Sequence, residues 1–303
     1  MSKARPSPID IVGITLGTIV LIVVIASVAL IAHGHGSVNQ WRGLDMRRWW
    51  APERFQPFQN RRLREEKDEQ VSGNFATIEI RNIAGEIDIH GGTGDCINVH
   101  SVKSAMFPAA MENLTVGIEK RGDRLLVEER HEIGFLMSAG VVSLNITLPR
   151  SIRTIEAHSV SGSITVHDVP IGISQNLNTI SGPVSTVNTG NLDISSTSGS
   201  VQFTFGGDRL NAHTVSGSIE GQIESLGQGG TATLRSVSGS VDIEAYDGLN
   251  AFVSLSSMSG AVSCGFPLTV AVQRRNSLEG KIGEGSSRVD VATTSGTIAI
   301  RKM

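Results

Sequence analysis

Polar and apolar residues alternate along most of the chain beyond residue 72, and the alternation recurs around a series of Ser-Gly pairs. Near-copies of one phrase appear as HSVSGSITVH (158–167), HTVSGSIEGQ (213–222) and RSVSGSVDIE (235–244). A period of two residues is typical of a β-strand with one buried face. The pattern therefore predicts a repeated unit made of a strand, a tight corner at the Ser-Gly pair and a second strand.

Three positions around each glycine hold one kind of residue. From Gly162 onward, the second residue after the glycine is always a β-branched aliphatic, the third before it is always Ser or Thr, and the fifth before it is apolar except at Arg275. We expect the hydroxyl column to point inward and to hydrogen-bond along the ladder or to the corner backbone. The corner needs glycine because it requires a positive φ or leaves no room for a Cβ. The predicted corner glycines are Gly85, Gly162, Gly182, Gly199, Gly217, Gly239, Gly260, Gly280 and Gly296.

From Gly162 onward, successive glycines are 16 to 22 residues apart, which indicates stacked supersecondary units. A two-stranded unit cannot bury its own apolar face, so the units above and below must cover it. We predict an all-β, single-domain β-solenoid of stacked rungs of about 20 residues, in which consecutive rungs are neighbours. Residues 91–150 are expected to form longer hairpins in the same sheet. The last rung ends at Ile300 and leaves an open end suited to a partner or a second copy.

The region before the solenoid has a different composition. Residues 11–32 form 22 positions without a charge, long enough as a helix to cross a bilayer core. We predict an N-terminal flank (1–10), a transmembrane helix acting as a signal anchor (11–33), a juxtamembrane linker rich in Trp and Arg (34–71) that ends in a charged spacer, and the solenoid (72–303). A cleaved signal peptide is the alternative. Arg residues after the span favour a cytoplasmic domain, whereas the Lys-poor, Ser/Thr/Gly-rich surface favours export; we expect a single-pass protein with its solenoid outside.

The segment LPRSIRTIEAHSVSGSITV (148–166) and the serial SGSV and SGSI corners resemble the bacterial "putative-adhesin" family of β-strand-repeat proteins, also called toastrack-type domains. The resemblance covers about residues 74–303. It implies a solenoid that often carries a membrane anchor, a non-catalytic role in the cell envelope, and links to envelope stress in some relatives. The chain departs from the pattern at Glu279, where SLEG replaces the Ser-Gly pair, and at Arg275, so the rung at 272–284 is expected to be irregular.

Charge and candidate ligands narrow the function. A net charge of −3 gives no general attraction to nucleic acid, and we expect no nucleic-acid partner. Two distant cysteines, Cys96 and Cys264, are expected to be small buried residues. His158 and His213 share a column, but two rungs separate them, so they are too far apart to bind one metal ion. We expect no metal and no cofactor.

Glu220, Asp242 and Glu244 form an acidic patch on the predicted outer face, with Glu220 and Asp242 in adjacent rungs. Paired carboxylates can share a proton or a cation. However, no Lys or His joins them, so a solvated polar face is the simpler interpretation. We expect a membrane-anchored, non-enzymatic envelope protein that binds a protein or polymer through its solenoid. The alternatives are a polysaccharide-active solenoid enzyme that uses these acids, and a filament subunit that assembles through its ends.

Overall fold

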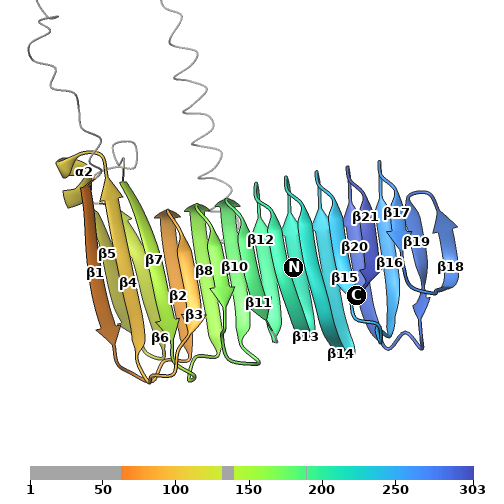
Figure 1. Ribbon diagram of the computed structural model, residues 1–303, viewed down its shortest axis with the longest axis horizontal. Helices are drawn as coiled ribbons and strands as arrows, with labels where there is room; N and C mark the ends of the chain where they lie inside the picture. Colours follow the sequence, from red (N-terminus) through yellow and green to blue (C-terminus); the bar gives the residue numbers. More distant parts are fainter. Residues whose placement is uncertain (1–62, 132–139, 189) are drawn as a thin grey trace, which may run out of the picture. The chain divides into compact units, whose positions relative to one another are not determined.

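The computed structural model describes residues 63–131, 140–188 and 190–303. Within these ranges the chain is almost entirely β-strand, wound into one long stack, with one short helix, α2 (Pro108–Glu112) (Figure 1). No helix of this described part is both long and apolar enough to cross a bilayer. The transmembrane helix predicted at 11–33 lies outside the described residues, as does most of the Trp/Arg-rich linker.

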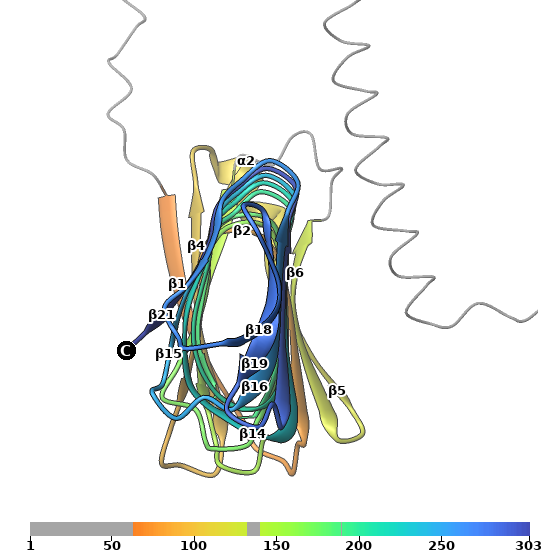
Figure 2. The ribbon, with the colours of Figure 1, turned by 90° about the vertical axis from the view of Figure 1, so that its right-hand side faces the viewer.

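Each regular rung gives one strand to each of two faces, which meet at the Ser-Gly corners (Figure 2). In spatial order, face 1 contains β5 (Leu114–Arg121), β6 (Arg124–His131), β2 (Thr77–Ala84), β8 (Thr154–Ser161), β10 (Ser174–Ser181), β12 (Asn191–Ser196), the second halves of β13 (Val201–Thr214) and β14 (Ile219–Ser236), β20 (Ser287–Thr293), β16 (Ala251–Ser257), β19 (Ser277–Ile282) and β18 (Thr269–Arg274).

Face 2 runs in the same direction along the stack. It contains β1 (Leu63–Val71), β4 (Ile97–Ala105), β7 (Gly140–Leu148), β3 (Ile87–Gly91), β9 (Ile164–His167), β11 (Val184–Asn188), the first halves of β13 and β14, β15 (Val241–Ala245), β21 (Ile298–Lys302) and β17 (Val262–Cys264).

The interior is a ladder of aliphatic side chains. In the middle of the stack the strands are parallel and in register, so Ile219 has Val201 on one side and Val241 on the other. All three side chains are buried, at 0–1% exposure. The solenoid predicted from the period of the corners is confirmed, because each rung covers the apolar row of its neighbour.

Close packing explains the corner glycines. A Cβ on Gly217 would lie 2.1 Å from the carbonyl oxygen of Gly199, and one on Gly239 would lie 1.9 Å from the oxygen of Gly217. Only Gly85 and Gly182 among the corner glycines of the described chain have a positive φ. The corner therefore needs glycine mainly because the next corner leaves no space for a side chain. The glycines that stack in this way, in spatial order, are Gly85, Gly162, Gly182, Gly199, Gly217, Gly239, Gly296 and Gly260.

The hydroxyl column is buried beside these corners, as predicted. Thr214 Oγ1 donates to the oxygen of Gly199 at 3.3 Å, and Ser236 Oγ donates to that of Gly217 at 3.2 Å. Ser257 and Thr293 make the same bond near the C-terminal end. Ser159, Thr179 and Ser196 are equally buried, but their hydroxyl oxygens have no hydrogen-bond partner among the described atoms. The column therefore links neighbouring corners in one half of the stack only.

The first rung of the sequence is not at the N-terminal end of the stack. The rung of β2 and β3 lies between the rung of β6 and β7 and the rung of β8 and β9. Beyond it, β5 and β6 form an antiparallel hairpin, and β4 pairs antiparallel with both β7 and β1. The hairpins predicted within 91–150 are confirmed, and they close the stack by pairing beyond the first regular rung.

The C-terminal end repeats this arrangement. The final rung, β20 and β21, is inserted between β14–β15 and β16–β17. The prediction that consecutive rungs are neighbours is wrong here. Gly280 is also not a corner: it lies in β19, opposite Val253 of β16 in an antiparallel pair. Arg275 and Asn276 form the turn of the β18–β19 hairpin, so the exposed arginine marks the end of a strand rather than a core position.

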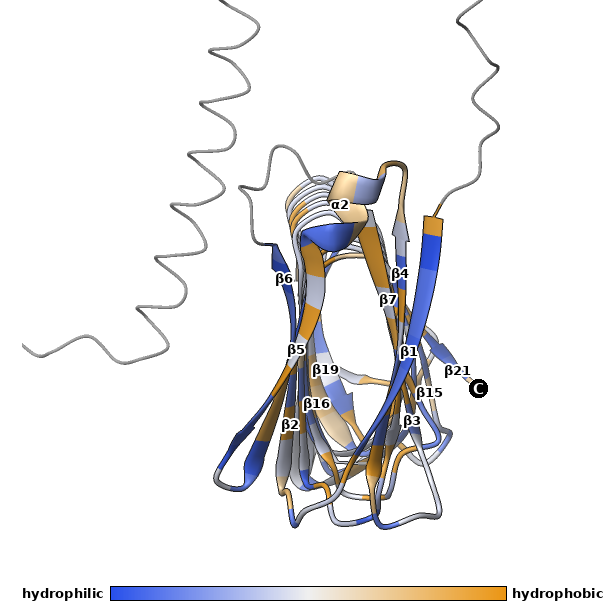
Figure 3. Cartoon of the chain, turned by 90° about the vertical axis from the view of Figure 1, so that its left-hand side faces the viewer, coloured by the Kyte–Doolittle hydropathy of each residue, from blue (hydrophilic) through white to orange (hydrophobic). Residues whose placement is uncertain are grey.

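The charged segment before residue 72 belongs to the sheet. The sequence places 34–71 in a linker, whereas β1 spans 63–71 and pairs with β4 along its whole length. Nearly all of its side chains are exposed, so neither face of β1 is buried and no apolar alternation reveals it (Figure 3). Lys103 of β4 forms an ion pair with Glu65 at 3.0 Å. Charges of this kind on an edge strand disfavour pairing with a further strand.

Candidate functional site

The structure brings the predicted acidic patch together on the outside of face 2. Glu220 of β14 lies opposite Asp242 of β15 in the ladder, and Gln222 lies opposite Glu244. These side chains point outward because their neighbours along each strand fill the interior. The residues of the patch line a shallow groove of about 480 Å³. Ser185 of β11 also belongs to its lining.

Each acid of the patch has a polar partner. Arg301 of β21 forms an ion pair with Asp242, and Gln222 Nε2 donates to Glu244 Oε2 at 3.2 Å. Ser218 Oγ donates to Glu220 Oε1 at 3.4 Å. Sequence reasoning missed Arg301, because nothing in the repeat pattern shows that the last strand lies beside β15. The guanidinium partly neutralises the patch.

Gly221, which has no side chain, lies at the floor of the groove. Gly221 occupies an inward position in β14, and a Cβ there would lie 2.2 Å from Cζ of Phe203. The Phe203 ring takes that space and is itself buried, at 4% exposure. The groove therefore presents carboxylates, amides and hydroxyls to a ligand, while the aromatic ring stays in the core. This arrangement offers hydrogen bonds to a polar ligand.

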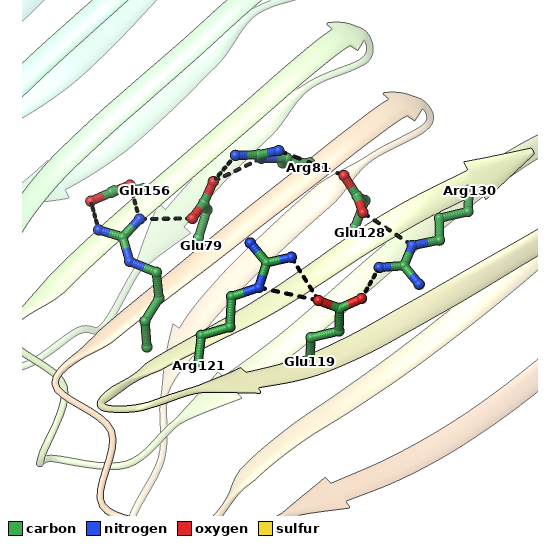
Figure 4. A network of polar contacts seen from close by, with 8 residues as sticks. Glu79, Arg81, Glu119, Arg121, Glu128, Arg130 and Glu156 are labelled. Atoms are coloured by element: carbon green, nitrogen blue, oxygen red, sulfur yellow. Dashed lines mark hydrogen bonds and ion pairs between the residues drawn. The ribbon is translucent and has the colours of Figure 1, made fainter. Parts of the chain in front are cut away.

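A second cluster lies on the outside of face 1, near the N-terminal end, where four glutamates and four arginines alternate (Figure 4). Arg124 contacts Glu79 at 2.7 Å and Glu156 at 2.8 Å. Arg81 also contacts Glu79, and it reaches Glu128 at 3.7 Å. The chain of contacts continues through Arg130 and Glu119 to Arg121 at the hairpin of β5 and β6.

The electrostatics of this network stabilise the charged forms. Burial acts to raise the pKa of Glu79, but hydrogen bonds from Arg124 and Arg81 outweigh it and hold that pKa below its usual value. Hydrogen bonds from Arg130 and Arg121 lower the pKa of Glu119. In the sequence, this network corresponds to alternating charges at outward positions of β2, β5 and β6. The repeated Ser-Gly corners do not predict it.

Ligand atoms of Glu79, Glu156 and His158 lie within 4.8 Å of one another, close enough to surround a cation. Both carboxylates already bind Arg124, however, so a cation would have to displace the guanidinium. His158 and His213 are separated in the ladder by Asn178 and Ser195, as predicted. The cluster is thus an ion-pair network that joins β8, β2, β6 and β5.

One further group of titratable residues lies near the N-terminal end of the stack. The rings of His90 and His167 stack with centroids 5.6 Å apart, and His167 lies between Asp168 at 2.9 Å and Asp88 at 3.2 Å. The hydrogen bond to Asp168 raises the pKa of His167.

The cysteines differ in part from expectation. Cys96 and Cys264 are unpaired, as the sequence suggests, but both are only half-buried. Burial raises the pKa of the Cys264 thiol, which disfavours the reactive thiolate. Neither cysteine is close to the acidic patch or to the ion-pair network.

Comparison with known proteins places this geometry in a family. The family model described as Toastrack DUF4097 matches residues 128–301, more than half of the chain. The chain belongs to the Toastrack family. The matched region begins in β6 and ends in β21, so it takes in the rungs from β8 and β9 onward, including the inserted C-terminal rung, and leaves out the rung of β2 and β3. A search of curated proteins gives no match.

Solved structures similar to this Toastrack chain come from species of Clostridium, Bacteroides and Parabacteroides. A "putative cell adhesion protein" from Clostridium sporogenes is 12% identical, with a TM-score of 0.35, and the match covers 80% of this chain and 100% of that one. A "putative adhesin" from Bacteroides fragilis is 12% identical, with a TM-score of 0.32 and coverages of 78% and 97%. A "putative lipid binding protein" from Parabacteroides distasonis is 13% identical, with a TM-score of 0.31 and coverages of 79% and 96%.

Proposed function

We propose that this Toastrack protein is a membrane-anchored, non-enzymatic component of the bacterial cell envelope, whose solenoid is a binding or scaffold surface. The role is adhesin-like or related to envelope stress. The apolar segment 11–33 would hold the chain in the membrane as a single-pass anchor, and the solenoid would lie outside the cytoplasm.

The outer polar rows of the two faces carry this proposal. On face 1, Asn176, Asp193 and Asn211 lie side by side on successive strands, over a shallow groove of about 310 Å³. On face 2, the row of Ser185, Gln202, Glu220 and Asp242 has the same arrangement. Strands about 4.8 Å apart present one polar group each, a spacing that suits an extended ligand with repeated hydroxyl or amide groups.

The partners of the acids favour binding over catalysis. A glycosidase needs one carboxyl group that stays protonated and a second that is free to act as base or nucleophile. Asp242 is instead ion-paired with Arg301, and Glu244 accepts from Gln222, on a groove open to water. One oxygen of each acid is therefore already engaged by a neighbouring side chain.

Binding and turnover are tested together on envelope polysaccharides. We expect the full-length protein in detergent to retain one class of glycan without releasing reducing ends, and Asp242→Asn with Glu244→Gln to weaken retention. Asp247→Asn is the matched control, because Asp247 is also ion-paired but lies in the turn after β15, outside both polar rows. Turnover that disappears in Asp242→Asn would establish the enzyme instead.

The anchor and the orientation have their own test. We expect the protein to stay in the membrane pellet after alkaline carbonate extraction, and to leave it when residues 11–32 are deleted. In intact spheroplasts, added protease should degrade the solenoid. Protection of the solenoid until the membrane is broken would place it in the cytoplasm and contradict the proposal.

A further inference from the structure

The edge of the solenoid that carries the Ser-Gly corners also carries most of its exposed apolar side chains. The residue two before each corner glycine points outward there, and Val160, Val215, Val237 and Met258 are 39%, 41%, 43% and 75% exposed. Ile83 and Ile180 occupy the same position in their rungs and are half-buried, and exposed Thr197 and Thr294 occupy it in the remaining two. With strands about 4.8 Å apart, the row from Ile83 to Met258 is about 34 Å long.

The N-terminal end of the stack extends this row. The strand β4 ends at the corner edge, because it is antiparallel to β7, and β7 is parallel to β3, which starts at the Gly85 corner. Met106 and Phe107, which follow β4, are 60% and 53% exposed. Figures 2 and 3 show α2, next in the chain, beside the corners. We call this strip, with Val141 and Leu63 beside it, the corner edge.

The corner edge is almost free of charge. The two residues before and the one after each stacked corner glycine are Ser, Thr, Ala, Pro or an aliphatic, with Glu86 as the exception. The opposite edge of the stack is exposed and charged, and it is acidic on balance because its acids outnumber Arg150, Arg153 and Arg209. Its acids are Asp95, Asp168, Asp208, Glu224, Asp247 and Glu284. An acidic edge is repelled by anionic lipid, whereas a neutral edge of hydroxyl and aliphatic groups suits the layer between headgroups and acyl chains.

The chain also enters the described structure at this edge. Leu63, the first residue of β1, pairs with Ala105, the last residue of β4. The uncharged run 11–32 ends only 30 residues earlier in the sequence. Figure 3 shows the end of β1 beside α2 as hydrophobic and the rest of the strand as hydrophilic. If the run spans the bilayer, the point of entry at Leu63 favours the corner edge over the opposite edge as the side that faces the membrane.

We propose that the corner edge lies against the lipid surface, so that the rungs stand side by side on the membrane and both polar faces remain open to a partner. This inference rests on the membrane anchor of the proposed function. The corner repeat then has two roles, since its glycine and hydroxyl columns build the core while its exposed aliphatic column contacts lipid. A protein partner or a second copy on the same edge is the competing occupant.

Site-directed fluorescence on the full chain tests this inference. Cys96→Ser and Cys264→Ser remove the native thiols, and bimane is attached at Val215→Cys on the corner edge or at Gln228→Cys, exposed on the opposite edge. The labelled proteins are placed in phosphatidylcholine vesicles whose acyl chains carry bromine near the headgroup. We expect bromine to quench the probe at position 215 and to leave the probe at position 228 unchanged.

Three outcomes would overturn the inference. Equal fluorescence in brominated and ordinary vesicles at position 215 means that lipid does not cover the corner edge. Equal quenching at both positions means that neither edge is preferred. A probe at position 215 that is shielded from water and is not quenched by bromine, with cross-linked dimers, means that a second copy covers the edge. Flotation of the same vesicles on a density gradient tests the membrane anchor separately. If the protein does not float with the vesicles, the anchor itself is refuted.

Discussion

At the scale of single residues, the corner is the feature that the structure explains best. Each corner glycine lies against the carbonyl oxygen of the next, so the backbones of neighbouring rungs approach more closely than a side chain allows. The sequence predicts both the glycines and the buried hydroxyls, because the same residue type recurs in every rung. It does not show that Ser159, Thr179 and Ser196 lack a partner, since that depends on small shifts between rungs.

Substitution of one corner glycine should unfold the surrounding rungs. In Gly217→Val the new Cβ would lie 2.1 Å from the oxygen of Gly199, so the two corners must separate. We expect a loss of about 3 kcal/mol or more in the free energy of unfolding, measured by urea denaturation. Gly94→Ala is the control, because nothing lies within 4 Å of a Cβ there. Equal stability of both variants would contradict the close-packed corner.

The hydroxyl column allows a matched comparison. Thr214 Oγ1 donates to a buried carbonyl, whereas the equally buried Thr179 Oγ1 has no partner in the described structure. Thr214→Val should cost about 1 kcal/mol, since a hydrogen bond is lost, and Thr179→Val should be neutral or stabilising. Thermal unfolding of the two variants checks this, and equal destabilisation would show that the two hydroxyls have the same surroundings.

At the scale of elements, both ends of the stack are closed by insertion. In a regular corner, Val215 N and Ser216 N donate to carbonyl oxygens of the preceding rung. At the first corner the equivalent donors, Ile83 N and Ala84 N, bind Glu129 Oε2 at 2.6 and 3.1 Å. Glu129 is buried, and its other oxygen contacts His131 at 2.8 Å. At this end the Glu129 carboxylate thus takes the place of the carbonyl oxygens that a preceding corner would supply.

Removal of this cap should destabilise the N-terminal rung. Glu129→Ala leaves two buried N–H groups without an acceptor, and we expect a loss of about 2–3 kcal/mol in the free energy of unfolding. Glu128→Ala, one residue away on the outer side, should cost less than about 1 kcal/mol, because its ion pairs are exposed. Amide hydrogen exchange at Ile83 and Ala84 reports the effect directly, and unchanged protection in Glu129→Ala would refute the cap.

The inserted rungs mark the limit of sequence reasoning at this scale. The repeated columns identify strands and corners, and they correctly predict Ile219 beside Val201 and Val241. All rungs carry the same columns, however, so the pattern contains no information on which rung follows which in space. The rung with Ile298 fits the ladder equally well at the end or between two others. For the same reason the contact of Arg301 with Asp242 could not be predicted.

At the scale of the whole molecule, the solenoid has two polar faces, one acidic edge and one neutral apolar edge. The acidic patch was found from sequence because its residues recur in register, and its groove is defined further by Gly221 and Phe203. The ion-pair network of Figure 4 depends on a hairpin that the repeat does not encode. The corner edge consists mainly of the residues two before each corner glycine. These side chains are exposed because the chain turns outward at the corner.

The order of the rungs is the most direct test of the stack. Ala292 of β20 pairs with Arg235 on one side and Ser256 on the other, and all three side chains point outward. In a chain without its native cysteines, we expect Ser256→Cys with Ala292→Cys to form a disulfide on mild oxidation. Arg235→Cys with Ser256→Cys should not, because two strand spacings, about 9.6 Å, exceed the reach of a disulfide. Cross-linking of the second pair and not the first would show that the rungs stack in sequence order, and would contradict the structure.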